Sequence, residues 1–322
     1  MVKAIKINQI KPKAIFMGSS GVARGLTPDH EVFSNQEPVY NLGILGANAY
    51  ELKRYFQYAT NNNNVETAVV SLDFYAFNQL RDVRPGFSDL RLSTKYMIPQ
   101  DLFGLYFSFD SLNLIFNPDA RGLYFATDGT YERHLDKDKI DFIFEVEILE
   151  DFSREEDMYW AYELSDMAID DYREMINLSN QQGVDIKLFI PPLHSTLFYA
   201  AMISGHWSSY EEWFREVVSV QPVWDFSGCS SVTTEAIGVD MQNFEDPSHY
   251  SPEIGKLVLN RMFNYQAESV PDDFGVYVTP DNVDQHLKQV RAQCDQWEEN
   301  SPEVVRWVKS LELSGQSVSL QK

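Results

Sequence analysis

Hydrophobic runs and helical periodicities alternate near the start of the chain. Lys13–Met17 (KAIFM) is a short apolar run closed by Gly-Ser-Ser-Gly, which predicts a buried strand that ends in a tight turn. Val39–Leu42 (VYNL) predicts a second strand, and Ala49–Thr60, after a glycine-rich turn, has helical periodicity. Glu66–Leu72 (ETAVVSL) predicts a third strand, apolar throughout, as parallel strands buried on both faces are. This order predicts a parallel α/β sheet.

The pattern changes over residues 79–151, where Pro, Gly and aromatic clusters such as DLFGLYFSFDSLNLIF predict an insertion packed over the sheet. Ser153–Gln181 then predicts one long helix, with a capping box formed by Ser153 and Glu156. Gly183 follows this helix and leads into the strand DIKLFI. The regular alternation has therefore resumed.

The last part of the chain completes the predicted fold. Residues 223–226 (VWDF) predict a short strand, Ser251–Asn264 predicts an amphipathic helix begun by Ser-Pro, and residues 280–313 predict a helical tail. We predict a three-layer α/β/α fold with a parallel, flavodoxin-like sheet. Residues 1–270 would form the main domain with its insertion, and residues 271–322 a helical C-terminal extension packed on it.

The charge balance narrows the classes of partner. The 322 residues contain 26 Lys and Arg against 48 Asp and Glu, a formal net charge of −22. No basic cluster is dense enough to bind a phosphate backbone, so nucleic acid is excluded, and neutral glycans are favoured over polyanionic polymers. The 44% of hydrophobic residues suffice for a packed core.

No cluster of residues predicts a metal ion or cofactor. Cys229 and Cys294 are too few for a disulfide scaffold and lie in no CxxC or Cys/His cluster. Residues 117–128 mimic a calcium loop, but Arg121 stands at a ligand position and Asp128 replaces the bidentate glutamate. Four other histidines have no metal-binding spacing, namely His30, His134, His206 and His286.

The chain has no run of about 18 apolar residues that would predict a transmembrane helix. Its first residues, MVKAIKINQIKPKAIFMGSS, carry the lysines of a signal peptide but no adequate apolar stretch. Two alternatives stay open: a cytoplasmic protein, or a chain from which an N-terminal anchor has been removed.

Chemistry-bearing residues recur where predicted strands end. Ser20 lies on the turn after the first strand, at the carboxyl edge of the sheet, where a helix N-terminus favours developing negative charge. A serine nucleophile needs a base, and Asp246 and His249, three residues apart on one loop, would supply the base and the group that orients it. The alternatives are a plain turn at Ser20 and a capping or core histidine at His249.

These motifs resemble the blocks of the SGNH (GDSL-type) hydrolase superfamily, in the same order. The resemblance covers roughly residues 13–78 and 184–264. It implies that Ser20 is the nucleophile, that Gly46 in N-x-G-x-x-G offers an oxyanion-hole N–H beside that of Ser20, and that Asp246-x-x-His249 completes a catalytic triad. Gly46 alternatively serves only a tight turn.

Two blocks depart from the family pattern. Ser19 replaces the usual aspartate before the nucleophile, a variant found in envelope proteins resembling alginate O-acetylation and teichoic-acid D-alanylation proteins. The usual third-block asparagine is not evident, since SLDFYAFN places Tyr75 near its position, between Asp73 and Asn78. Losing one oxyanion donor costs about 2.7–4 kcal/mol. We therefore consider Tyr75 and Asn48 as substitute donors.

The resemblance extends to bacterial SGNH-like cell-envelope proteins through stretches such as GSSGVARGLTPDH and DPSHYSPEIGKLVLNRMF. It implies a periplasmic or envelope location with an N-terminal anchor, and a partnership with a membrane-bound acyl-exporting protein. The function expected is serine-dependent acyl transfer or ester hydrolysis on an envelope carbohydrate. The alternative is a non-catalytic scaffold protein of an acyl-modification complex.

Two further residues are considered for substrate binding. Arg24 would hold an anionic group of the substrate, or else form a surface ion pair. His194, in FIPPLHST after a predicted strand, would lie near the substrate at the sheet edge, or else be a satisfied loop histidine.

Overall fold

The computed structural model describes residues 2–94, 124–132, 136–153, 158–159, 161–311 and 313. The aromatic stretch at 103–116, His134, Glu156 and most of the calcium-like segment lie outside these residues. No helix in the described ranges is long and apolar enough to cross a membrane.

A six-stranded sheet forms the centre of the molecule, in the order β2-β1-β3-β6-β7-β10. The strands are β1 (Ala14–Met17), β2 (Val39–Asn41), β3 (Thr67–Ser71), β6 (Asp185–Ile190), β7 (Val223–Asp225) and β10 (Val276–Val278). The first five are parallel and follow the flavodoxin-like order, whereas β10 pairs antiparallel with β7. The predicted three-layer α/β/α fold is therefore confirmed.

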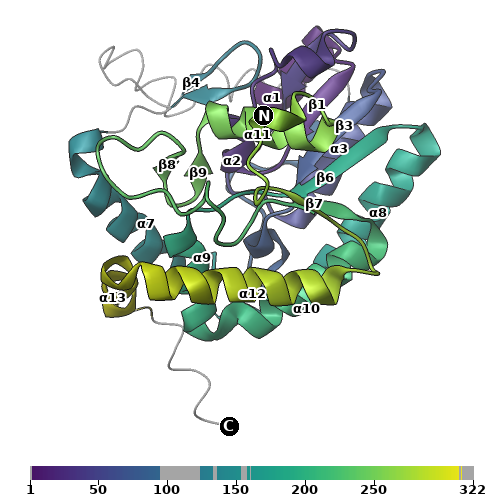
Figure 1. Ribbon diagram of the computed structural model, residues 1–322. Coiled ribbons are helices and arrows are strands. Elements are labelled where there is room, and N and C mark those ends of the chain that lie inside the picture. The colour runs from purple at the N-terminus through teal and green to yellow at the C-terminus, as the bar shows by residue number, and fades with distance from the viewer. Residues whose placement is uncertain are drawn as a thin grey trace, which may run out of the picture.

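Helices cover both faces of the sheet (Figure 1). They are α1 (Val2–Ile10), α2 (Ser20–Gly25), α3 (Ala49–Asn62), α7 (Ile140–Ser153), α8 (Asp166–Gln182), α9 (Ser195–Ala201), α10 (Trp207–Val220), α11 (Pro252–Phe263), α12 (Val283–Asn300) and α13 (Pro302–Ser310), besides the short α4 (Asp89–Leu92). Small two-stranded sheets are formed by β4 (Tyr124–Phe125) with β5 (Tyr131–Glu132) and by β8 (Phe244–Asp246) with β9 (His249–Tyr250).

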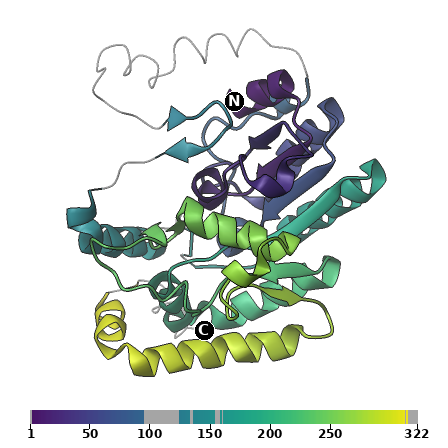
Figure 2. The ribbon, with the colours of Figure 1, turned by 45° about the horizontal axis from the view of Figure 1, so that its top comes forward.

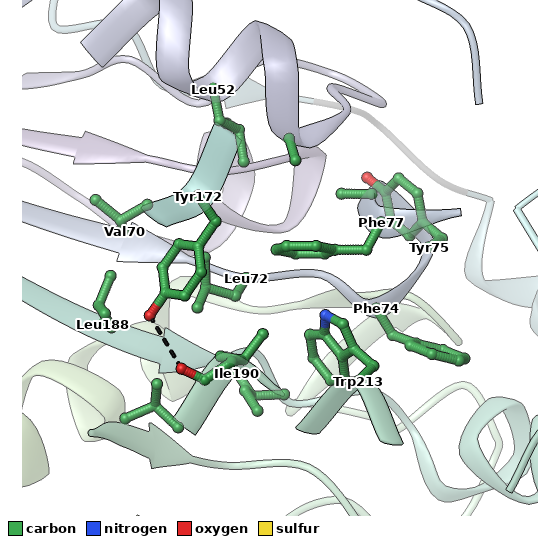
Figure 3. Packing of buried hydrophobic residues seen from close by; sticks show 14 of the residues in the cluster. Leu52, Val70, Leu72, Phe74, Tyr75, Phe77, Tyr172, Leu188, Ile190 and Trp213 are labelled. Carbon is green, nitrogen blue, oxygen red and sulfur yellow. Dashed lines mark hydrogen bonds between the residues drawn. The ribbon is translucent and has the colours of Figure 1, made fainter. Parts of the chain in front are cut away.

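Two hydrophobic cores lie on opposite faces because side chains alternate along each strand. Ile15 of β1 and Val70 of β3 face a core shared with α3, α8 and α10, part of which Figure 3 shows around Trp213. Phe16 and Val69, one position away, face a second core shared with α2, α7 and α11. Burial on both faces explains why these strands are apolar throughout.

The prediction of one helix over Ser153–Gln181 was wrong. Helix α7 ends at Ser153, and α8 begins only after Ser165, whose Oγ accepts a hydrogen bond from the Ala168 N–H at 3.3 Å. Between them Tyr162 is buried and stacks on Phe74, with 3.9 Å between ring centroids. An apolar loop residue that fills the core mimics helical periodicity. Helix α1 was not predicted, although the spacing of its buried Ala4 and Ile7 fits a helix.

The C-terminal segment packs along one side of the molecule, where α12 and α13 appear in yellow (Figure 2). Its helices match the predicted helical tail, but β10 was not predicted. A disulfide joins Cys229, in the loop after β7, to Cys294 of α12. Nearby, His286 Nε2 lies 2.6 Å from a carboxylate oxygen of the buried Asp225. The segment is thus tied to the sheet by a strand, a disulfide and a buried polar pair.

Candidate active site

The turn after β1 places two serines at the carboxyl edge of the sheet. Gly18 has φ +152°, and a Cβ there would lie 2.1 Å from Ser71 Oγ, so the close approach of β1 to β3 requires glycine. Ser19 is the N-cap of α2, and its Oγ accepts a hydrogen bond from the Gly21 N–H at 3.3 Å. Ser20 is therefore fixed as the first residue of α2.

The β8–β9 hairpin brings His249 and Asp246 to Ser20 across 229 residues of sequence. His249 Nε2 lies 2.7 Å from Ser20 Oγ, and its Nδ1 lies 2.6 Å from Asp246 Oδ1. The Ser248 N–H and Oγ each donate to the same carboxylate oxygen at 3.0 Å. The carboxylate thus holds Nδ1 as the protonated nitrogen and leaves Nε2 free to accept the serine proton.

Arg24 completes the surroundings of Asp246. Its guanidinium Nη1 lies 3.1 Å from Asp246 Oδ2 and 3.4 Å from a carboxylate oxygen of Glu245. Burial raises the pKa of Asp246, but His249, Arg24 and the Ser248 N–H together lower it below its usual range. Asp246 is therefore ionised at neutral pH. Arg24 forms this ion pair in a buried position, not at the surface as one alternative predicted, and its substrate-binding role stays a prediction.

A second carboxyl group, Asp73, contacts Ser19. Its Oδ1 accepts from Ser19 Oγ and its Oδ2 from Ser71 Oγ, each at 3.0 Å. Burial raises the pKa of Asp73, and these hydrogen bonds and the nearby His249 only partly oppose that shift. Sequence reasoning considered Asp73 only as a neighbour of Tyr75. Its position directly after a buried strand is a signal that could have placed it at the candidate site.

Tyr75 lies in the 3₁₀ helix Phe74–Phe77 that follows β3. No described atom meets hydrogen-bond geometry with its buried Oη. Burial and the charge of Asp73 raise the pKa of the hydroxyl, which the neighbouring Ser19 and Arg81 only partly offset. Tyr75 is thus a neutral hydroxyl beside the Ser19–Ser20 turn, available to donate a hydrogen bond.

The loop that carries Gly46 packs against the same turn. The Ile44 N–H donates to Gly18 O at 2.7 Å, and a Cβ on Gly43 would lie 2.5 Å from Ala23 N. Gly46 has φ +65°, as a tight turn requires, and its carbonyl accepts from Arg81. Its oxyanion role stays a prediction.

Asn48 has a different role from the substitute oxyanion donor that we predicted. Its Oδ1 accepts from the Glu51 N–H at 3.0 Å, and Glu51 bonds back to the Asn48 N–H, forming a capping box for α3. The Asn48 amide nitrogen donates to Arg81 O at 3.0 Å. Both side-chain ends therefore hold local structure in place, and its oxyanion role stays a prediction.

His194 is likewise a structural residue in this geometry. It caps α9, with Nδ1 2.8 Å from Thr196 Oγ1 and Nε2 2.8 Å from Glu235 O. Burial lowers the pKa of the ring to about 4, so the ring is neutral at physiological pH. This placement agrees with the alternative that His194 is a loop histidine whose ring nitrogens are both hydrogen-bonded within the protein. Its substrate-binding role stays a prediction.

A cavity opens beside the nucleophile. Ser19, Ser20 and Asp73 line one part of it, and the rest is bounded mainly by apolar side chains of α9, α10 and the 3₁₀ helix after β3. Across the described ranges, no group of three His, Cys, Asp or Glu side chains is arranged to hold a metal ion.

Comparison with known proteins adds little. No protein-family model and no curated protein matches the chain. A solved structure from Bacteroides fragilis NCTC 9343, named as a candidate acylhydrolase, is similar with a TM-score of 0.39 and 13% identity, over 84% of this chain and 96% of that one. At this level of similarity, only the chain's own geometry bears on its chemistry.

Proposed function

We propose that the chain is an SGNH-like serine acyl hydrolase or acyltransferase. One observation carries the proposal: a continuous line of short contacts from Ser20 Oγ through both ring nitrogens of His249 to Asp246, at 2.7 and 2.6 Å. Nucleophile, base and orienting carboxylate are the three roles that serine-dependent acyl transfer needs.

The proposed reaction has two halves. Ser20 Oγ attacks the carbonyl carbon of an ester while its proton passes to His249 Nε2, and the C–O bond to the alcohol breaks as that alcohol takes the proton from His249. The resulting acyl-Ser20 ester is then attacked by water or a sugar hydroxyl, whose proton returns through His249 to Ser20 Oγ. Hydrolysis and transfer use the same groups and differ only in the acceptor.

The oxyanion of each tetrahedral intermediate needs hydrogen-bond donors. We infer that the N–H groups of Ser20 and Gly46 and the Tyr75 hydroxyl supply them. The position of Tyr75 with Ser19 and Ser20 in the lining of one cavity supports this assignment, since a hydroxyl there can donate to an oxyanion formed at Ser20.

We further propose an envelope carbohydrate as the acyl acceptor or donor, a periplasmic location with an N-terminal anchor, and a membrane-bound acyl-exporting partner. The Cys229–Cys294 disulfide supports an oxidising compartment, because such bonds are rare in reducing cytosol. The net charge of −22 favours neutral glycans over polyanions. These assignments otherwise rest on the sequence resemblance.

A non-catalytic scaffold is the second candidate. The capping role of Asn48 favours it, since the missing third-block asparagine then has no amide substitute at that position. The two candidates differ in whether Ser20 reacts.

The test is turnover of p-nitrophenyl acetate and an acetylated neutral glycan by wild type, Ser20→Ala and Ser208→Ala, the last an exposed serine on α10. We expect Ser20→Ala to lose at least about 10³-fold in kcat and Ser208→Ala to match wild type. Equal rates for wild type and Ser20→Ala would remove Ser20 from the mechanism. No turnover together with no labelling by a fluorophosphonate would favour the scaffold.

A further inference from the structure

The cavity beside Ser20 is narrow and lined mainly by apolar surface, more of it than the single methyl of an acetyl group can cover. Large apolar or aromatic side chains dominate its lining, among them Phe74, Tyr159, Leu197, Phe198, Trp207 and Tyr210. Ser20 lies on the same cavity wall, so an acyl group on its Oγ is next to this surface.

One helix face supplies much of the wall. Leu197, Phe198 and Ala201 of α9, with Met202 directly after it, recur at the spacing of neighbouring positions on a helix surface. Leu197 and Phe198 are buried, whereas Ala201 and Met202 are half-buried. The small side chain of Ala201 leaves room in a wall that is otherwise built of large residues.

A cluster of aromatic rings forms another part of the wall. Tyr210 lies 5.4 Å from Phe74, 5.3 Å from Phe198 and 5.6 Å from Trp207, measured between ring centroids. Its hydroxyl is 2.8 Å from Ser227 Oγ, so this buried polar atom is satisfied without a ligand. Aromatic rings locked against one another form a preformed surface for apolar groups.

The charges of the lining groups select against charged ligands. Burial lowers the pKa of His206, so its ring is neutral at pH 7, and burial raises the pKa of the Tyr159 and Tyr210 hydroxyls. These three side chains therefore offer no charge that would pair with a charged acyl group. A neutral apolar chain fits such a lining.

We propose that this cavity binds the acyl chain of the substrate, and that the preferred acyl group is a neutral, apolar chain longer than acetyl. This inference rests on the proposed function, since it assigns the group carried by acyl-Ser20. It narrows the acyl group, which the sequence resemblance leaves open, to a neutral chain longer than acetyl.

The test measures kcat/KM for p-nitrophenyl esters of acetate, butyrate, hexanoate and octanoate. Each methylene that becomes buried is expected to raise kcat/KM by up to about fourfold, so hexanoate should exceed acetate by at least about tenfold. Labelling of Ser20 by methyl and octyl fluorophosphonates gives a second readout that needs no turnover, and the octyl probe should react faster.

Ala201→Phe fills the cavity from α9, and Ala292→Phe makes the same change at an exposed position of α12. Ala201→Phe should lower kcat/KM for octanoate at least about tenfold more than it lowers kcat/KM for acetate, while Ala292→Phe should leave both unchanged. Thermal unfolding of both variants checks that they fold.

A flat or falling chain-length profile in the wild type overturns the inference, whatever the variant does. Equal losses for acetate and octanoate in a folded Ala201→Phe also overturn it. In both cases acetate turnover that requires Ser20 would leave the proposed function intact. No turnover and no labelling with any chain length would instead overturn the proposed function itself.

Discussion

Two buried aspartates flank the Ser19–Ser20 turn, and their surroundings differ. Asp246 contacts two groups that carry or can take a positive charge, Arg24 at 3.1 Å and His249 at 2.6 Å, and its pKa is lowered despite burial. Asp73 accepts hydrogen bonds from two hydroxyls, and burial raises its pKa. The same side chain is thus held as a charge on one side of the turn and driven toward the neutral acid on the other.

In the proposed mechanism, the difference indicates which carboxyl group serves the base. An imidazolium formed at His249 would be stabilised by a fixed negative charge beside Nδ1, and Asp246 is in direct contact with that nitrogen. Asp73 instead accepts hydrogen bonds from the Ser19 and Ser71 hydroxyls. The proposal therefore gives the two aspartates separate tasks, orientation of the base and support of the turn.

The largest effect is expected for Asp246→Asn. An amide there favours the wrong imidazole tautomer, so kcat for an ester should fall by about 10⁴-fold, with Asp240→Asn, an exposed change, as the matched control. Steady-state kinetics of both proteins measures this. A loss below tenfold would mean that Asp246 does not orient the base.

The pH dependence of Asp246 has a defined sign. Its folded-state pKa is lowered, so its contribution to stability is present above the ordinary carboxyl pKa of about 3.9 and is lost as the pH falls below that value. The melting temperature of wild type should therefore fall toward that of Asp246→Asn in strong acid, as calorimetry can measure.

A smaller but still large effect is expected for Arg24→Met. Removing one partner of a buried pair leaves Asp246 with an uncompensated charge, which costs about 3–5 kcal/mol of unfolding free energy. Arg215→Met breaks an exposed pair with Asp284 and should cost less than about 1 kcal/mol. Urea unfolding of the two variants compares them directly, and similar losses would show that Arg24 is not needed to compensate Asp246.

Removal of the disulfide is expected to lower stability at a place away from both aspartates. Cys229 and Cys294 are 65 residues apart, and a closed loop of that length contributes about 4 kcal/mol in the chain-entropy model. Reduction, or the double change Cys229→Ser and Cys294→Ser, should lower the urea midpoint while kcat stays within about twofold at temperatures where the protein is folded. A parallel loss of kcat would mean that the C-terminal segment positions the site.

The smallest effect is expected for Asp73→Asn, and its sign is opposite to that of Asp246→Asn. The folded-state pKa of Asp73 is raised, so the wild type loses stability as the pH rises above about 3.9 through that folded value. The variant should melt at a higher temperature than wild type at pH 7, and the gap should close toward pH 4. We expect kcat within about tenfold of wild type. A destabilised variant at pH 7 would show that the carboxylate itself is required.

Local patterns sufficed for much of the fold. The apolar stretch before Gly18 and the run Glu66–Leu72 predicted neighbouring strands because both faces of the sheet are buried there. The three residues Ser20, Asp246 and His249 were predicted from short motifs, and the structure brings them into contact. Their catalytic roles stay predictions.

The remaining features depend on contacts between distant segments. The capping box of Asn48 is an exception, because its partner Glu51 lies only three residues later in the sequence. The pairing of Cys229 with Cys294 and the burial of Arg24 against Asp246 follow from packing of the whole fold, which no local window contains. Tyr162 shows how a local pattern can mislead. It is a buried aromatic residue in a loop, and its position in the sequence fits helical periodicity.

The strand, the disulfide and the buried polar pair that attach the C-terminal segment make the protein sensitive to C-terminal truncation. A stop codon before residue 286 would leave the Asp225 carboxylate buried without its histidine and Cys229 with a free thiol. Since the loop after β7 also supplies Ser227 to the wall of the acyl cavity, such a truncation would reach the substrate site. Expression vectors for this protein should therefore retain this segment. A C-terminal tag is better placed after α13 than on a chain cut before β10.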